Sequence, residues 1–369
     1  MSIKILGSPS KYIQGAGEIE NIYHYISKFG ESFFVIADEV VTRLLSEKIK
    51  KSFEKCSAKL NFEQFNGEST YQEVDRIIEI FKSKKGDVII GVGGGKALDT
   101  AKLTAHKCGV PLVIVPTIAS TDAPCSALAV IYTDKGAFVS DYFLPQNPDI
   151  VIVDVEVIAQ APSRLLVSGM GDAFATYYEA RACKAADADN MFKGKATNAA
   201  YALAQLSNTI LLEDGLKAKI AVDNKIITKA LENIVETNIY LSGVGFESNG
   251  VAVAHGIYNG FTTLERAHKY YHGECVAFGT IVQLELENAP KSEIYEVLNF
   301  FFQVGLPMTF EDLGWADITL DEIAQASQAV VDGIIAHNMP FEVTYKDIYG
   351  AILAAEAEGK LFKQRIKNT

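Results

Sequence analysis

Three groups of residues in this chain are of types that could do chemistry. The first is a glycine-rich stretch, residues 91–96, which follows a short apolar run and opens onto a helical pattern. Consecutive glycines leave no side chains above the backbone, and the free N–H groups at a helix start favour a phosphate. The stretch is therefore compatible with a nucleotide-binding loop, and also with a plain strand-to-helix turn.

Two familiar phosphate-binding motifs are excluded for this stretch. A phosphate-loop NTPase needs Ser or Thr after the Gly-Lys pair, where this chain has Ala97. The common dinucleotide fingerprint needs glycine at the position of Lys96. Any dinucleotide bound here is held by another arrangement.

The second group is polar and follows apolar runs that read as buried strands. Residues 116–124 place Thr117, Ser120 and Asp122 between two prolines, a polar density that is typical of functional loops. Asp38 ends an earlier apolar run and could accept hydrogen bonds from a ribose diol, which favours NAD over NADP. A helix N-cap is an equally good interpretation of Asp38.

The third group consists of Asp172, His255 and His272. Two imidazoles and a carboxylate suit a catalytic zinc or ferrous ion and leave a coordination position for substrate or water. The spacing is not diagnostic, so each histidine could also be a hydrogen-bonded structural residue. Both histidines precede glycine, and His255 lies in an apolar segment where an imidazole needs a partner.

The elements that must position these groups change character along the chain. Strand and helix patterns alternate through the first part, which predicts a mostly parallel sheet covered on both faces. The predicted strands are residues 31–38, 59–65, 87–90, 110–115 and 150–155, and the predicted helices are 40–53, 73–82 and one ending near 108. Ligands of such sheets bind outside the carboxyl ends of the strands.

The second part of the chain is predicted to be helical. Residues 127–132 and 137–144 form a predicted hairpin, and from residue 163 the periodicity is helical over 173–185, 199–212, 217–242 and 276–287. We therefore expect an α/β domain over residues 1–160 and an all-helical domain over residues 161–369.

Composition sets outer bounds on function. The 369 residues carry a net charge of −12, which argues against nucleic acid and anionic membranes as partners. Five scattered cysteines without a CxxC pair favour free thiols in a reducing compartment. The N-terminus has no apolar signal region, so a cytoplasmic protein is expected.

Five motifs together carry a resemblance. Residues 93–102, 116–127, 169–173, 254–256 and 271–274 resemble the glycerol dehydrogenase branch of the iron-containing (group III) alcohol dehydrogenase superfamily, and the similarity extends over nearly the whole chain. The resemblance implies an N-terminal Rossmann-like NAD-binding domain and an all-α metal-binding domain, the dehydroquinate synthase-like fold, with the active site in the cleft between them.

The resemblance also assigns roles to residues. It implies that Asp172, His255 and His272 are zinc ligands that also contact substrate, and that Asp122 contacts the polyol. The positions at or beside the NAD site are Asp38, Gly94, Gly95, Lys96, Asp99, Thr117, Ser120, Ser126, Leu128 and Tyr132. It further implies a homo-oligomer, often an octamer.

The implied reaction is the NAD-dependent oxidation of glycerol and related vicinal diols. Zinc would hold two adjacent hydroxyls, and hydride would pass from the alkoxide to NAD and give dihydroxyacetone. Iron-using relatives place a further histidine four residues after the aspartate, where this chain has Thr176, and this favours zinc over iron or manganese. Relatives also often carry a second histidine where this chain has Tyr258 and Asn259, so an imidazole proton relay is not expected there.

Two other functions stay open. A phosphorylated-polyol dehydrogenase or a dehydroquinate-synthase-like lyase would need cations for a phosphate or carboxylate, and Arg266 and Lys269 lie close to His272 in the sequence. His268 is also near enough to contact substrate. The other open hypothesis is a non-enzymatic nucleotide-binding regulator.

Overall fold

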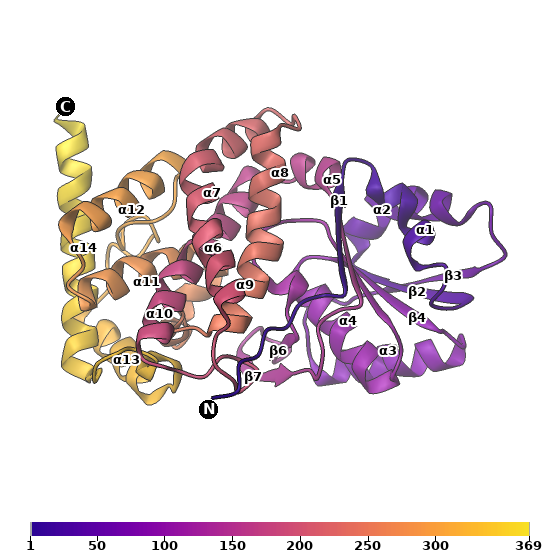
Figure 1. Ribbon diagram of the computed structural model, residues 1–369, viewed down its shortest axis with the longest axis horizontal. Coiled ribbons are helices and arrows are strands. Elements are labelled where there is room, and N and C mark those ends of the chain that lie inside the picture. Colours follow the sequence, from indigo (N-terminus) through magenta and orange to yellow (C-terminus); the bar gives the residue numbers. More distant parts are fainter. Residues whose placement is uncertain (1, 369) are drawn as a thin grey trace.

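Six short strands pair into one parallel sheet in the N-terminal half of the chain (Figure 1), in a computed structural model that describes residues 2–368. Their order across the sheet is β1-β8-β5-β4-β2-β3. The strands are β1 (Lys11–Gly15), β2 (Ser32–Ala37), β3 (Lys59–Gln64), β4 (Val88–Gly93), β5 (Leu112–Pro116) and β8 (Ile150–Asp154). Strands β2, β4, β5 and β8 are buried at every residue, as expected for a sheet covered on both faces.

Helices pack on both faces because successive side chains of each strand point to opposite sides. Phe33 and Val35 of β2 join the core that includes Ile49, whereas Phe34 and Ile36 join the core that includes Ile77. The helices concerned are α1 (Ile22–Ile26), α2 (Glu39–Phe53), α3 (Tyr71–Ser83) and α4 (Gly95–Cys108). The predicted α/β class and its covered parallel sheet are confirmed.

Strand β1 did not follow from the sequence pattern. It pairs in parallel with β8 at the edge of the sheet, and its residues are only partly buried or exposed. Because an edge strand that mixes polar and apolar residues has no continuous apolar run, periodicity gives no signal for it.

The strand order reverses between β2 and β4. From β2 the chain first moves outward to β3 and then crosses back to β4, β5 and β8 on the other side. Asp38 and Gly94 directly follow these two strands, so both lie at the edge where ligands of open parallel sheets bind.

A small hairpin lies between the sheet and the helical half. Strands β6 (Leu128–Tyr132) and β7 (Phe138–Phe143) pair antiparallel, as predicted. The hairpin packs on α4 through a small core that includes Leu103, Ala129 and Ile131. The short helix α5 (Val155–Gln160) follows β8 and ends the α/β half.

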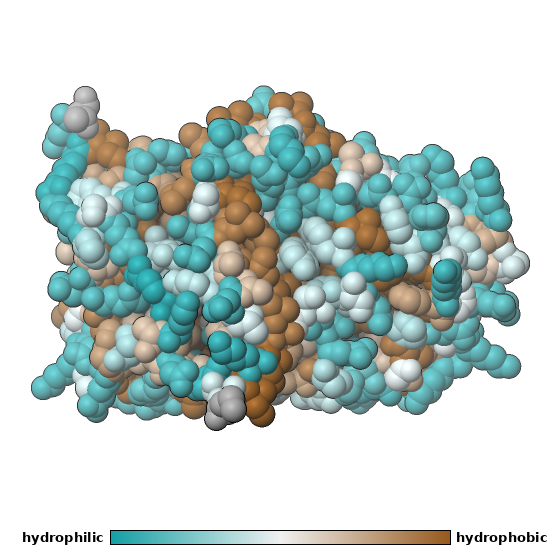
Figure 2. Space-filling model, in the orientation of Figure 1, coloured by the Kyte–Doolittle hydropathy of each residue, from teal (hydrophilic) through white to brown (hydrophobic). Residues whose placement is uncertain are grey.

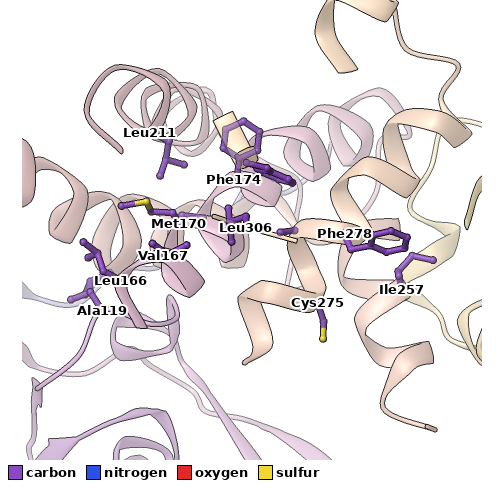
Figure 3. Packing of buried hydrophobic residues seen from close by; sticks show 14 of the residues in the cluster. Ala119, Leu166, Val167, Met170, Phe174, Leu211, Ile257, Cys275, Phe278 and Leu306 are labelled. Atoms are coloured by element: carbon purple, nitrogen blue, oxygen red, sulfur yellow. The ribbon is translucent and has the colours of Figure 1, made fainter. Parts of the chain in front are cut away.

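The second half is all helical, as predicted (Figure 1). Its α-helices are α6 (Ser163–Ala185), α7 (Asn198–Asp223), α8 (Lys229–Glu236), α9 (Ser242–Asn249), α10 (Val253–Phe261), α11 (His272–Leu286), α12 (Lys291–Val304), α13 (Leu320–Asp332) and α14 (Tyr345–Lys367). One hydrophobic core continues from the sheet into these helices, and Figure 3 shows Ala119, from the loop after β5, beside Leu166 of α6.

The prediction of a single helix over residues 217–242 is wrong. Helix α7 ends at Asp223, and Lys225 takes a left-handed φ of 58° that a helix cannot contain. Thr228 then caps α8 by accepting the N–H of Leu231 at 3.2 Å. A turn of π-helix, η3 (Thr237–Leu241), joins α8 to α9. The apolar residues keep helical spacing across this break, so the sequence pattern does not indicate that the helix ends here.

Across residues 2–368, none of the helices is long and apolar enough to cross a bilayer.

Candidate active site

Asp172, His255 and His272 come together although they are far apart in the sequence. Asp172 lies in α6, His255 in α10, and His272 is the first residue of α11. Each residue offers one ligand atom, and the three atoms lie within 4.8 Å of one another. The structure therefore forms the predicted cluster, while its role as a metal site stays a prediction.

Glycines allow the two helices that carry this cluster to touch. A Cβ atom on Gly273 would lie 1.8 Å from the carbonyl oxygen of Ser168, and one on Gly171 would lie 2.4 Å from the oxygen of Gly273. Only backbone fits between α6 and α11 at this crossing. The glycines beside Asp172 and His272 thus set the distance between the two side chains.

The carboxylate of Asp172 has one oxygen in use and one without a partner. Its Oδ2 accepts the backbone N–H of Asp122 at 3.1 Å. Its Oδ1 is buried and makes no hydrogen bond of acceptable geometry within residues 2–368, although His272 Nε2 and His255 Nε2 lie 3.1 and 3.4 Å away. A buried oxygen costs free energy unless it is paired, and a cation between these three atoms would pair it. The donor set fits a divalent metal ion.

Glu179 holds His255 from the side opposite Asp172. Its Oε2 lies 2.6 Å from Nδ1 of His255, and its Oε1 accepts the backbone N–H groups of His255 and Ala252, both at 2.9 Å. This arrangement fixes the imidazole so that Nε2 faces Asp172. Sequence reasoning missed Glu179, although it lies two helical turns after Asp172 on the same face of α6.

The cluster favours positive charge. Burial lowers the pKa of His255, but the carboxylates of Glu179 and Asp172 outweigh burial and hold this pKa well above its usual value. For Asp172 burial acts to raise the pKa, yet the two imidazoles outweigh it and lower the pKa below its usual value. Two buried carboxylates around two imidazoles make a site that a cation would complete.

Asp122 reaches the cluster from the loop after β5. Its Oδ2 accepts the hydroxyl of Ser242 at 2.8 Å, and Ser242 Oγ lies 2.8 Å from the hydroxyl oxygen of Thr176. Burial and the charge of Asp172 raise the pKa of Asp122 well above its usual value. Thr176, one helical turn after Asp172 on α6, thus reaches Asp122 through Ser242.

The glycine-rich stretch forms the turn into α4. Gly93 takes a φ of 150°, which L side chains rarely adopt, and Gly94 is the N-cap of α4. Lys96 forms an ion pair with Glu68, and its Nζ lies 5.1 Å from the centre of the Tyr132 ring. The free N–H groups of this helix start are suited to an anion.

Asp38 serves as the N-cap of α2 and also lines a cavity. Its Oδ1 accepts the N–H of Val41 at 2.8 Å, so the N-cap interpretation is realised. Asp38 also lines a shallow cavity of about 330 Å³, together with residues at the end of β3 that include Gln64 and Asn66. The cap uses one carboxylate oxygen and leaves the ligand hypothesis for Asp38 as a prediction.

Asp99 and Ser126 are tied into a buried network around Lys102. Four oxygens surround the Lys102 Nζ and share its three N–H groups: Asp99 Oδ1 at 3.1 Å, Ser126 Oγ at 3.2 Å, and the carbonyl oxygens of Ala123 and Leu128 at 2.6 and 2.8 Å. Asp99 Oδ2 also accepts the N–H of Val130 at 3.1 Å. These contacts fasten the start of the hairpin to α4, so these two residues have a structural task whatever their part in cofactor binding.

Two other predicted positions lie in the loop after β5. Thr117 donates its backbone N–H to the Gly93 carbonyl oxygen at 3.0 Å, and the carbonyl oxygen of Ser120 accepts the hydroxyl of Ser168 at 3.2 Å. Both residues are buried. The loop is therefore fixed on one side to the glycine turn and on the other to α6.

The cations proposed for a phosphate lie elsewhere. Arg266 pairs with Asp317 at 2.8 Å and Glu322 at 3.0 Å, and Lys269 and His268 are exposed. Arg164, over the ring of Tyr271, binds both carboxylate oxygens of Glu274 at 2.6 and 2.9 Å. These arginines are committed to carboxylates of the protein.

The chain is similar to curated glycerol dehydrogenases over nearly its whole length. The model for the iron-containing alcohol dehydrogenase family matches residues 9–155. A glycerol dehydrogenase of Escherichia coli O6:H1 is 48% identical over 365 residues, which cover 98% of this chain and 99% of that protein. A glycerol dehydrogenase of Thermotoga maritima is 47% identical and covers 96% of this chain and 97% of its own.

Solved structures agree. The glycerol dehydrogenase of Schizosaccharomyces pombe matches with a TM-score of 0.95 at 34% identity, covering 100% of this chain and 94% of its own. A probable glycerol dehydrogenase of Sinorhizobium meliloti matches with a TM-score of 0.91 at 43% identity, covering 97% and 99%.

Proposed function

The chain belongs to the iron-containing alcohol dehydrogenase family and is an oxidoreductase, and from this premise we propose that it oxidises glycerol and related vicinal diols with NAD to hydroxyketones such as dihydroxyacetone. The observation that carries the proposal is the cluster of Asp172, His255 and His272 with Asp122 directly beside it. Asp122 comes from the α/β half and the cluster from the helical half. Substrate and cofactor would meet where the two halves join.

We assign the metal to Asp172, His255 and His272, with zinc as the proposed ion. The unpartnered Oδ1 of Asp172 and the two Nε2 atoms that face it supply three ligands. A bound divalent ion supplies Lewis acidity, which lowers the pKa of a substrate hydroxyl toward neutrality. Glu179 would hold a proton on Nδ1 of His255 and leave Nε2 to the ion, which would replace the proton that the raised pKa of His255 otherwise keeps there.

We propose that Asp122 orients one hydroxyl of the diol. Its Oδ2 is engaged by Ser242 and its backbone N–H by Asp172, so both its main chain and its carboxylate are fixed. Oδ1 is the oxygen that we assign to the substrate. A fixed acceptor beside the reacting carbon removes rotational freedom before the reaction, which contributes to rate.

We propose that NAD lies along the ends of β2, β4 and β5. The nicotinamide ring accepts the hydride when NAD is bound. The residues proposed to hold the cofactor are Asp38, Gly94, Gly95, Lys96, Asp99, Thr117, Ser120, Ser126, Leu128 and Tyr132. The acid at Asp38 favours NAD over NADP because it repels a 2′-phosphate. A pyrophosphate at the start of α4 would compete with Glu68 for Lys96.

We also propose that the protein self-associates and works in the cytoplasm. Figure 2 shows a hydrophobic band down the middle of one face, from the helices around α7 and α8 to the lower edge near β7. Leu206, Leu216 and Ile220 of α7 are exposed and lie within one side of the helix. An exposed apolar face of this kind supports an interface between copies. The five cysteines are unpaired, which fits a reducing compartment.

One combined experiment tests the function. Metal content of the purified protein is measured alongside NAD and NADP reduction with glycerol, 1,2-propanediol and glycerol 1-phosphate. We expect one zinc per chain, activity with the two diols and NAD, and loss of activity with EDTA that zinc restores. Full activity in a metal-free preparation would contradict the assignment of a catalytic metal to these residues. Preference for glycerol 1-phosphate would favour the phosphorylated-polyol alternative.

A further inference from the structure

The loop that carries Asp122 is held by one helical segment of the other half. Asn238, in the π-helical turn η3, donates to the Ala119 carbonyl oxygen at 3.0 Å. One turn later Ser242 donates to Asp122, and Glu247 accepts the N–H of Ala127 at 2.6 Å. Successive turns of η3 and α9 therefore contact the beginning, middle and end of the loop.

Within this segment Ser242 has a distinct contact. It bonds the carboxylate of Asp122, whereas Asn238 and Glu247 contact the loop at its backbone, at Ala119 and Ala127. Ser242 and Thr176 are fully buried, so water does not compete for their hydroxyls. A Cβ on the next residue, Gly243, would lie 2.8 Å from the Asp122 carbonyl oxygen, so α9 backbone packs directly under Asp122.

The hydroxyl protons are ordered along this chain of contacts. Ser242 donates its hydroxyl proton to Oδ2 of Asp122, which lies 2.8 Å away. The Ser242 oxygen is then free to accept, and Thr176 donates its proton to Ser242. When Thr176 donates to the Ser242 oxygen, the Ser242 proton is directed toward Asp122.

We propose that Ser242 is a positioning residue for Asp122 and that Thr176 orients the Ser242 hydroxyl. Together they hold the carboxylate so that Oδ1 faces the diol. The expected effect on kcat/KM rests on the proposed diol oxidation. The expected orientation of the Asp122 carboxylate rests on the contacts described above. Neither hydroxyl touches substrate; both act through Asp122.

The test compares hydroxyl removal with hydroxyl retention in the metal-loaded enzyme. Ser242→Ala is expected to lower kcat/KM for glycerol about tenfold, the size of one buried hydrogen bond. Thr176→Val is expected to lower it by a smaller factor, and Thr176→Ser to recover most of that loss. Zinc content and the Kd for NADH are expected to stay at the wild-type level. Ser327→Ala is the matched control, because Ser327 is equally buried and donates to the carbonyl oxygen of Ile323 in its own helix.

A double-mutant cycle decides whether Ser242 acts through Asp122. We expect Ser242→Ala to have no further effect on kcat/KM in an Asp122→Asn background. Losses that multiply, or a Ser242→Ala enzyme with wild-type kcat/KM, overturn the inference. So does a loss that is matched by loss of zinc.

Crystal structures keep the inference testable without activity. In Ser242→Ala the Asp122 carboxylate is expected to rotate or to occupy two orientations, and an unchanged carboxylate overturns the inference. If the wild-type enzyme oxidises no diol, the proposed function fails on its own, and the position of the Asp122 carboxylate still decides the structural part.

Discussion

Glu179 Oε2 lies 2.6 Å from His255 Nδ1, and the same carboxylate binds the backbone N–H of His255. The two residues are 76 positions apart in the chain, yet a single carboxyl group fixes both the ring and the main chain of the histidine. A ring held in this way has one tautomer and one direction for Nε2. The cluster is therefore organised by a residue that is not among its three candidate ligands.

Glu179→Gln should weaken metal binding strongly. The amide would present an N–H to His255 Nδ1 or lose that bond, which favours the tautomer with its proton on Nε2, the atom that faces Asp172. We expect the zinc affinity to fall at least 10- to 100-fold, measured by competition with a chromophoric chelator. Glu293→Gln is the control, since Glu293 pairs with Arg181 at the partly exposed end of α12. Equal affinity in Glu179→Gln and wild type would refute the role.

Metal binding should stabilise the folded protein through Asp172. Zinc added to metal-free wild-type protein should raise the Tm, because a ligand that binds only the folded state shifts unfolding. In Asp172→Asn the shift should be absent, since the amide cannot supply a charged oxygen between the two imidazoles. Differential scanning fluorimetry with and without zinc measures this, and circular dichroism checks that the variant is folded. A wild-type-sized shift in Asp172→Asn would contradict the assignment.

Glu68 should oppose cofactor binding by holding Lys96. Removing the charge in Glu68→Gln should free Lys96 for the cofactor and lower the Kd for NADH about threefold or more, whereas Lys96→Met should raise it. Fluorescence titration of NADH measures both. Lys107→Met serves as the control, because Lys107 also pairs with an aspartate, Asp75, and lies over an aromatic ring, that of Tyr71. A Kd that is the same in Glu68→Gln as in wild type would show that the ion pair does not compete.

Glu247 should make the stability fall as pH rises from about 4.5 to about 7. Burial raises the pKa of Glu247 from 4.5 to about 7, and the hydrogen bonds from Asn147 and Ala127 only partly offset this. Because the folded state binds this proton more tightly than the unfolded state, its contribution is full below the unfolded pKa and lost as pH passes the folded pKa. The loss is about 3 kcal/mol at most.

The comparison with Glu247→Gln isolates this group. The free energies of unfolding of wild type and variant, measured in urea at several pH values, should differ by an amount that changes between pH 4.5 and 7 and is constant above that window. A difference that is independent of pH would rule out the titration of Glu247.

The crossing of α6 and α11 should tolerate no side chain. In Gly273→Ala the new Cβ would meet the Ser168 carbonyl oxygen at 1.8 Å, so the helices must separate and Asp172 must move away from His272. We expect a lower Tm and loss of zinc. Gly350→Ala is the matched control, because Gly350 lies inside α14 with open space around it, and there alanine should stabilise by about 0.5–1 kcal/mol. Zinc retained at full stoichiometry in Gly273→Ala would contradict the packing argument.

Much of the architecture could be read from the sequence because it depends on local patterns. The fully buried strands β2, β4, β5 and β8 are continuous apolar runs, and the glycine turn before α4 is a run of residues with special backbone freedom. Strand β1 and the end of α7 at Asp223 were not predicted, because neither is marked by a continuous apolar run or by a change in apolar spacing. An edge strand needs no apolar run, and a turn can keep apolar spacing through it.

The sequence by itself determined which residue types were available for chemistry: a carboxylate and two imidazoles, a polar loop between prolines, and glycines before a helix. Its motifs also determined the family. Only the tertiary structure decided which groups meet, because Glu179, Ser242 and Lys102 act through contacts with residues distant in the chain. Their partners are chosen by the crossing of helices and by burial, which make an unpaired polar group costly. The spacing of residues along a single chain does not predict which distant residues come into contact.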